Sequence, residues 1–293
     1  MAASGPGTGK GGWLNFLLAL VTLAVTAFVL GYLLFTSPDR AVELPAGPTL
    51  PAKHEPPEQL GAGEEIPPKA GKPRPRVAVI MDDIGMNMAP LSDIEAIGAP
   101  VAVAVLPGLR HSTDAALAAK AAGMEVLLHL PMQPDGDSLH GLGPGALLTG
   151  MTDAELSEAT SQGLESVPGA SGVNNHMGSA LTRDPRAMKA VMGVLKERGL
   201  YFVDSRTTSG SAALAEARGL GVRARGRDVF LDDIDDPARI REQLEKLVAK
   251  AARDGVAVGI GHPRPATLAV LAEELPRLKA RGIDVVRVSE IVR

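Results

Sequence analysis

From residue 77 to the end of the chain, short apolar runs alternate with amphipathic stretches. The apolar runs predict strands at Val77–Met81, Val101–Leu106, Glu125–Leu130, Gly172–Asn174, Leu200–Val203, Asp228–Leu231, Val256–Ile260 and Ile283–Val288. The stretches between them predict helices at Thr113–Ala122, Asp153–Glu165, Pro185–Arg198, Pro237–Arg253 and Ala266–Arg281. Continuous apolar strands separated by such helices indicate βαβ units and a parallel sheet buried on both faces. The pattern predicts one α/β domain, either a barrel or a wound sheet.

Several predicted helices carry recognisable end signals. Thr152 is followed three residues later by Glu155, and Asp236 stands directly before Pro237. Both patterns are typical of helix N-termini, where a side-chain oxygen accepts a hydrogen bond from a free backbone amide. Glycines follow several predicted helices, as expected at helix C-termini.

A different pattern precedes this domain. Trp13–Phe35 is a run of 23 residues without a formal charge, and a helix of about 20 apolar residues spans a bilayer. Its length and the poor cleavage context after Leu33 favour an uncleaved signal anchor over a removed signal peptide. With Lys10 and the amino terminus inside, we predict a cytoplasmic tail at residues 1–12, a single-pass inner-membrane helix at 13–35 and a periplasmic C-terminal domain.

Residues 36–76 read as a linker. Ten prolines fall in this segment, mixed with Glu, Lys and Gly, and such a composition cannot bury a core. We predict a disordered, extended tether between the membrane helix and the domain at residues 77–293.

Overall composition narrows the function. The net charge of -4 offers no basic field for a phosphate backbone, so we expect no nucleic-acid partner. The absence of cysteine excludes disulfides and thiolate metal sites. A hydrophobic content of 45% with 22% charged residues is that of a globular chain.

Polar residues with chemical potential follow several predicted strands. They are Asp82 and Asp83 after the first strand, His129 near the end of the third, the run Asn174-Asn175-His176, Asp204 and Arg206 after the fifth, and His262 after the seventh. The carboxyl ends of parallel strands form the usual ligand face of an α/β domain. Carboxylates and imidazoles gathered there suit zinc or another divalent cation.

Each residue also has a structural interpretation. Asp82 or Asp83 could cap the next helix, His129 could be a hydrogen-bonded packing residue, and Asp204 could pair with Arg206. We interpret Asp232, Asp233, Asp235 and Asp236 as a solvated acidic turn followed by a helix cap.

Five motifs in order, VIMDDIG, LLHLPMQP, GVNNHMGS, YFVDSRT and GIGHPRP, resemble the divergent polysaccharide deacetylase family, a remote branch of the NodB-like carbohydrate esterases. The resemblance covers the domain and neither the anchor nor the linker. It implies a distorted (β/α) barrel of about seven strands. It also implies metal-dependent hydrolysis of an N-acetyl group, an amide, on a cell-envelope carbohydrate or a related small ligand.

The resemblance assigns roles residue by residue. Asp83 would be a metal ligand, Asp82 the base that activates water, and His262 the acid that protonates the leaving amine. The main family takes two ligands from one His-Ser/Thr-x-x-His motif, whereas His129 here is followed by Leu-Pro-Met. We therefore expect His176 to complete the set Asp83, His129 and His176 around a divalent metal, with zinc favoured.

Further residues are expected to support this site. Asp204 would orient His262 or another group beside the ligands. Asn174, Asn175 and Arg206 are predicted to bind substrate.

Scarce aromatics argue against a long polysaccharide substrate. The domain has only Tyr201, Phe202 and Phe230, whereas pyranose rings bind against flat aromatic faces. Two other classes stay open: a catalytically weak or inactive envelope scaffold that keeps the metal pocket and binds cell-envelope proteins, and a hydrolase for another amide or ester.

Overall fold

The computed structural model describes residues 73–136 and 139–293. The predicted tail, membrane helix and most of the predicted linker lie outside these residues. Within the described part, no helix has the length and apolar character needed to cross a bilayer.

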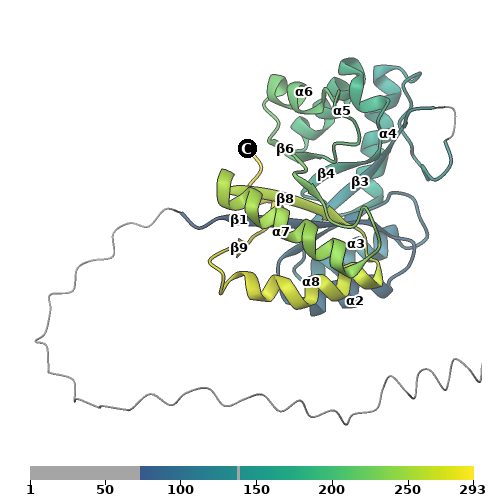
Figure 1. Ribbon diagram of the computed structural model, residues 1–293. Coiled ribbons are helices and arrows are strands. Elements are labelled where there is room, and N and C mark those ends of the chain that lie inside the picture. Colours follow the sequence, from purple (N-terminus) through teal and green to yellow (C-terminus); the bar gives the residue numbers. More distant parts are fainter. Residues whose placement is uncertain (1–72, 137–138) are drawn as a thin grey trace, which may run out of the picture. The chain divides into compact units, whose positions relative to one another are not determined.

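A parallel sheet forms the centre of the domain (Figure 1). Its strands are β1 Arg76–Ile84, β2 Val101–Val105, β3 Val126–Met132, β4 Gly172–Met177, β5 Tyr201–Asp204, β6 Ala224–Gly226, β7 Val229–Phe230, β8 Val256–Gly261 and β9 Asp284–Val285. The spatial order is β6-β5-β4-β3-β2-β1-β8-β7, and β9 pairs with β1. Every described pair is parallel, so the carboxyl ends of the strands share one rim.

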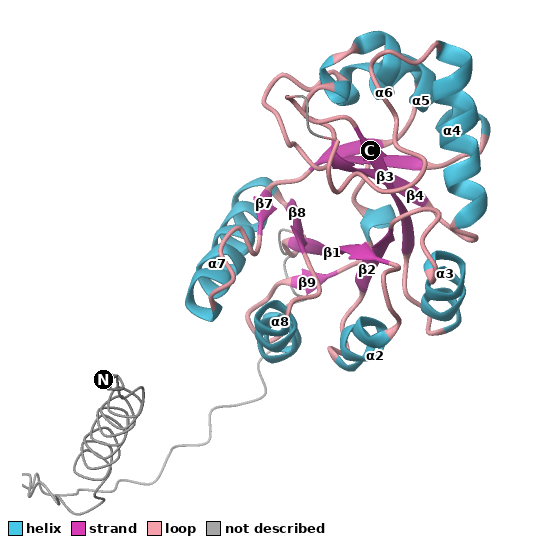
Figure 2. Ribbon diagram, turned by 90° about the vertical axis from the view of Figure 1, so that its right-hand side faces the viewer, coloured by secondary structure: helices cyan, strands magenta, loops and turns pink. Residues whose placement is uncertain are grey.

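The sheet curls with its helices outside, as Figure 2 shows. Its two terminal strands, β6 and β7, are not paired with each other. They are pieces of one stretch that leaves β5 and joins β8 after two residues, Arg227 and Asp228. When this stretch is counted once, the curled sheet has seven strand positions, which agrees with the predicted distorted (β/α) barrel.

Seven described α-helices cover the outside of the sheet. They are α2 Ala89–Ala96, α3 Ser112–Ala121, α4 Asp153–Ser166, α5 Pro185–Glu197, α6 Ala213–Leu220, α7 Pro237–Asp254 and α8 Pro265–Leu278. The predicted end signals are confirmed, because Thr152 and Glu155 form a capping box on α4 and Asp236 caps α7.

Two apolar layers stabilise the fold. The larger lies between the sheet and the helices, and the smaller fills the barrel interior with residues such as Ile80, Leu127 and Ile260. A Cβ on Gly172 would lie 2.3 Å from the Tyr201 ring, so glycine is needed for this close packing. Burial of these side chains is the main force holding the sheet curled.

The C-terminal segment closes the end of the barrel where the strands begin. Val288, at the start of the short 3-10 helix η2 Val288–Glu290, belongs to the inner apolar layer with Ile291. The Glu125 carboxylate accepts hydrogen bonds from the backbone amides of Val288 and Ser289. This segment covers the end where the strands begin, and the carboxyl ends of the strands lie on the opposite rim.

The sequence pattern missed the shortest elements. Helices α2 and α6, each eight residues long, and strand β6 were not predicted. The last apolar run was predicted as a strand over Ile283–Val288, but only Asp284–Val285 pairs before η2 begins. Periodicity over so few residues does not separate a strand from a packed turn.

Candidate functional site

The alternation of side chains along the strands leads directly into the site. Ile80, Leu127 and Ile260 point into the barrel, and two residues farther along their chains come Asp82, His129 and His262. Residues two apart lie on the same face of a strand. The candidate site is thus the polar top layer of the barrel interior.

Asp83 reaches the same space through a backbone irregularity. The pairing of β1 with β2 shifts register between Met81 and Ile84, and Asp83 has a φ of 60°. Bulges of this kind redirect side chains. The non-glycine residues with positive φ in the described chain, Asp83, Met177 and Arg206, all lie at strand ends on this rim. Strained backbone of this kind tends to cluster at functional sites.

Asp83, His129 and His176 bring one ligand atom each to a common point. Asp83 Oδ1 lies 3.3 Å from His129 Nε2 and 3.1 Å from His176 Nδ1, and the two ring nitrogens are 3.1 Å apart. Ligands bound at about 2.0–2.1 Å to one tetrahedral ion lie roughly 3.3 Å from each other. Asp83 Oδ1 is buried and makes no hydrogen bond of normal geometry. The three residues fit a divalent metal, as the sequence predicted.

Asn174 supports this cluster from β4. Its side-chain oxygen lies 2.9 Å from His129 Nδ1 and accepts that nitrogen's proton, which leaves His129 Nε2 free to face the cluster. The Asn174 amide nitrogen donates to Asp82 Oδ1 at 2.8 Å. One fully buried amide therefore fixes both the imidazole tautomer and the carboxylate.

The two adjacent carboxylates differ in electrostatics. Burial raises the pKa of Asp82 above its usual value, although His129 and the Asn174 amide partly offset the effect. Burial acts in the same direction on Asp83, but contacts with His129 and His176 hold the pKa of Asp83 far below its usual value. Asp83 therefore suits an ionised metal ligand, and Asp82, with its raised pKa, suits a proton acceptor.

The raised pKa of His129 indicates that the ligand cluster favours a positive charge. Burial alone would lower the pKa of His129, but the carboxylates of Asp82 and Asp83 raise it above the usual value. A divalent cation would supply the same compensation and leave the imidazole neutral, as metal ligation requires.

His262 is oriented by Asp232. His262 Nδ1 lies 3.0 Å from Asp232 Oδ1, and the His262 backbone amide donates to Asp232 Oδ2 at 2.7 Å. Thr267 Oγ1 also donates to Asp232 Oδ2. The other ring nitrogen, Nε2, lies 3.7 Å from Asp83 Oδ2 and so faces the metal cluster.

This geometry corrects two expectations. Asp232 is fully buried and not part of a solvated turn, although Asp233, Asp235 and Asp236 are exposed. Asp204 was expected to orient His262, but Asp232 makes that contact. The Asp204 carboxylate instead accepts a hydrogen bond from the Arg206 backbone amide. Asp232 was not predicted as a site residue because it stands in a run of acidic residues that reads as a solvated turn.

Replacing Asp232 with asparagine should shift the pH profile of turnover. Burial alone would lower the pKa of His262, but the Asp232 carboxylate raises it and so keeps the ring protonated at higher pH. Without that charge the pKa falls, and the alkaline limb of kcat should move to lower pH. Kinetics from pH 5 to 10 measure this, and an unmoved limb would show that His262 is not the titrating acid.

The predicted substrate-binding residues separate into two groups. Asn174 and Asn175 are buried, and Asn175 accepts from the Ser205 amide and donates to the Met177 carbonyl. Their amides are used within the protein, which argues against the predicted substrate contact and gives both a positioning role. Arg206 is exposed on the rim, where a substrate could reach it.

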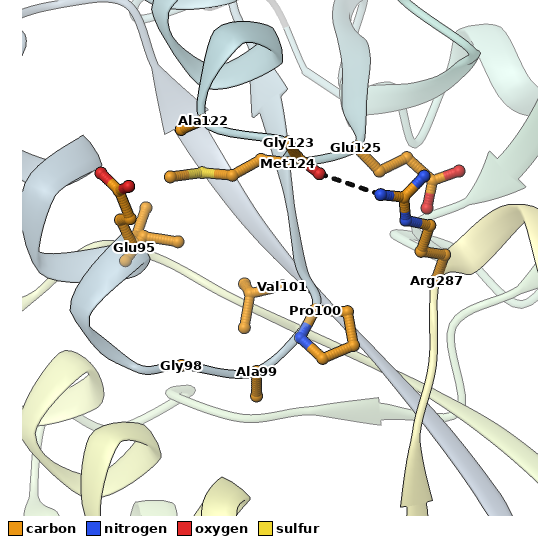
Figure 3. Close-up of a pocket in the computed structure, with 11 residues that line it drawn as sticks. Glu95, Gly98, Ala99, Pro100, Val101, Ala122, Gly123, Met124, Glu125 and Arg287 are labelled. Atoms are coloured by element: carbon orange, nitrogen blue, oxygen red, sulfur yellow. Dashed lines mark hydrogen bonds between the residues drawn. The ribbon is translucent and has the colours of Figure 1, made fainter.

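A separate pocket opens where β2 and β3 begin (Figure 3). Its lining is mostly backbone and apolar side chains, with Arg287 donating to the Gly123 carbonyl. Glu125, also in the lining, is occupied by the amides of η2. The Arg287 and Glu125 side chains in this pocket are therefore engaged by backbone groups of the protein.

A family model described as divergent polysaccharide deacetylase matches residues 79–292. The chain belongs to the divergent polysaccharide deacetylase family. An uncharacterized protein of Haemophilus influenzae is 37% identical over 69% of this chain and 72% of its own length. The uncharacterized protein YibQ of Escherichia coli is 37% identical over 74% of this chain and 67% of its own.

A solved structure supports the same architecture. An uncharacterized Agrobacterium tumefaciens protein superposes with a TM-score of 0.70 at 25% identity, covering 77% of this chain and 92% of its own. The curled parallel sheet of this divergent polysaccharide deacetylase family member agrees with the predicted distorted (β/α) barrel.

Proposed function

We propose that this domain is a metal-dependent hydrolase that removes an N-acetyl group from a cell-envelope carbohydrate or a related small ligand. The observation that supports this most is the meeting of Asp83, His129 and His176 at one point, with Asp82 and His262 beside them. Nitrogen and oxygen ligands without sulfur or a second carboxylate favour Zn²⁺ as the cation.

When bound, a divalent cation polarises a carbonyl oxygen and makes water more acidic. The protein's own groups would then move protons. Asp82 Oδ2, whose partner oxygen is held by Asn174, takes the proton of the attacking water. His262 Nε2 donates a proton to the amine as the C–N bond breaks, and Asp232 stabilises the imidazolium. Asp82 and His262 are thus the proposed base and acid.

Phe230 modifies the expectation from the scarce aromatics. Tyr201 and Phe202 are fully buried. Phe230, however, is half-buried and its ring lies edge-on to His262 with centroids 5.4 Å apart. One aromatic side chain therefore adjoins the proposed acid, which suits a single sugar residue better than an extended polymer.

Acetate release tests the proposed reaction. Purified protein loaded with Zn²⁺ should release acetate from N-acetylglucosamine oligosaccharides or peptidoglycan fragments, chelation should abolish the release, and added Zn²⁺ should restore it. Binding of these carbohydrates without acetate release, with or without metal, would instead identify an inactive scaffold that kept the pocket.

The sequence before the domain adds a proposal about location. The apolar run at residues 13–35 would anchor the protein in the inner membrane, with the hydrolase on the periplasmic side and near cell-envelope partners. Expressed from residue 1, the protein should sediment with membranes and be digested by protease added to spheroplasts. Recovery in the soluble cytoplasmic fraction would contradict this.

A further inference from the structure

Within the described residues, the guanidinium groups of Arg206 and Arg227 lie beside the site without a direct contact to a carboxylate. Arg206 and Arg227 form no ion pair with any carboxylate in the described part of the chain, whereas arginines such as Arg186, Arg239 and Arg281 do. Surface guanidinium groups commonly pair with nearby acids. Over residues 73–136 and 139–293, neither guanidinium is bound to a carboxylate by a direct contact, so both keep N–H donors that a ligand could use.

Arg227 is fixed in place by direct contacts with uncharged groups. It lies in the two-residue link between β6 and β7, and its Nε donates to the Ser205 carbonyl at 2.7 Å and its Nη2 to the Arg206 carbonyl at 3.2 Å. Its guanidinium carbon lies 4.9 Å from the centre of the Phe230 ring. Two carbonyl oxygens and an aromatic face hold the group rigidly, as a specific anion site requires.

Arg206 stands beside it on a strained turn. Its φ is 50°, and its guanidinium packs so closely over Gly226 that a Cβ there would lie 2.2 Å from Arg206 Nε. Burial lowers the pKa of Arg227, the charges of Asp82 and Asp204 raise it, and the charge of Arg206 lowers it. The two guanidinium groups repel each other, and an anion bound between them would relieve this repulsion.

The pair adjoins the proposed catalytic groups. Phe230 contacts the Arg227 guanidinium on its face and the His262 ring at 5.4 Å. A group bound by Arg227 would therefore lie one aromatic ring away from the proposed acid. That spacing matches a substituent on the sugar whose amide is cleaved, or on its neighbour.

We infer that Arg206 and Arg227 form a subsite for an anionic substituent, so that the enzyme acts on an acidic N-acetylated carbohydrate in preference to a neutral one. The inference rests on the proposed deacetylase function. Guanidinium forks bind carboxylate and phosphate through paired hydrogen bonds, and both anions share this chemistry.

Matched substrates test the inference. Wild-type kcat/KM should be higher for N-acetylmuramic acid or N-acetylglucosamine 6-phosphate than for N-acetylglucosamine, and the better of the two identifies carboxylate or phosphate. In Arg206→Gln and Arg227→Gln the acidic-to-neutral ratio should fall about tenfold or more, the expected size for a lost charged hydrogen bond. Gly226→Ala should lower the ratio too, because it displaces Arg206 without removing its charge.

Controls separate specificity from folding. Arg277→Gln, on the outer helix α8, should leave the ratio unchanged. Arg206→Gln replaces an exposed side chain, so it stays informative should Arg227→Gln unfold. A merely structural role would lower kcat/KM equally for all substrates, and an unchanged ratio would overturn the inference.

Binding keeps this test independent of turnover. Calorimetry with the deacetylated sugars muramic acid, glucosamine 6-phosphate and glucosamine needs no catalysis. If no acetate is released but Arg206→Gln still weakens acidic-sugar binding alone, the deacetylase proposal fails and the subsite stands. Equal wild-type affinity for all three sugars would remove the subsite.

Discussion

Replacing Asp82 with asparagine should lower the rate of acetate release by about 10²–10⁴-fold, the usual contribution of general acid–base catalysis. Asparagine has nearly the same shape, and its side-chain oxygen can still accept the hydrogen bond from Asn174. It cannot take a proton from water. Steady-state kinetics and metal analysis of the purified variant measure the two effects separately, and the metal content should stay close to that of wild type.

Asp236→Asn is the matched control for this change. Asp236 caps α7 outside the site, and asparagine is an equally good cap. Its turnover should match wild type. Retention of more than a tenth of wild-type activity in Asp82→Asn would assign the base to another group.

Removing a ligand should act on metal content before it acts on rate. Asp83→Ala and His176→Ala each delete one of the three atoms that meet at the cluster. Zinc affinity should fall by more than the roughly 10–100-fold caused by losing an outer hydrogen-bonding partner of a ligand. Equilibrium dialysis with zinc analysis measures the affinity, and acetate release should fall in parallel at limiting zinc.

His111→Ala serves as the control, because His111 precedes α3 and does not belong to the cluster. Unchanged zinc affinity in His176→Ala would remove His176 from the ligand set. This result bears on the departure from the main family, since His176 comes from β4 and His129 from β3.

Much of the fold follows from the sequence because its strands are long and apolar. The main helices and seven strands lie close to their predicted positions, and the helix end signals at Thr152 and Asp236 act as expected. Strand β6, with three residues, and its change of partner from β5 to β8 at β7 were not predictable. Whether such short segments form strands depends on pairing with residues far away in the sequence.

A divalent-metal site could be anticipated from the strand ends, and the family resemblance gave Asp83 as a ligand, but neither showed how Asp83 enters the cluster. In a regular strand, Asp82 and Asp83 would face opposite sides. The register shift and positive φ that turn Asp83 inward depend on the pairing of β1 with β2, which no local pattern reveals.

The period of two residues along a strand also identifies site residues. The spacing of two between Ile260 and His262, and between Leu127 and His129, marks the inward face. Asp232 has the same period from Phe230, which distinguishes it from the exposed acids that follow. The alternation of inward and outward side chains along the strands therefore identifies site residues that residue type alone does not.

The ligand cluster has a consequence for chain entropy. Asp83 and His176 lie more than 90 residues apart in the sequence. Strand β2 lies between β1 and β3 in the sheet. An ion held by β1, β3 and β4 would act as a reversible cross-link that closes a long loop, much as a disulfide does in other proteins. In a chain without cysteine, the melting temperature would then rise with the free concentration of the ion.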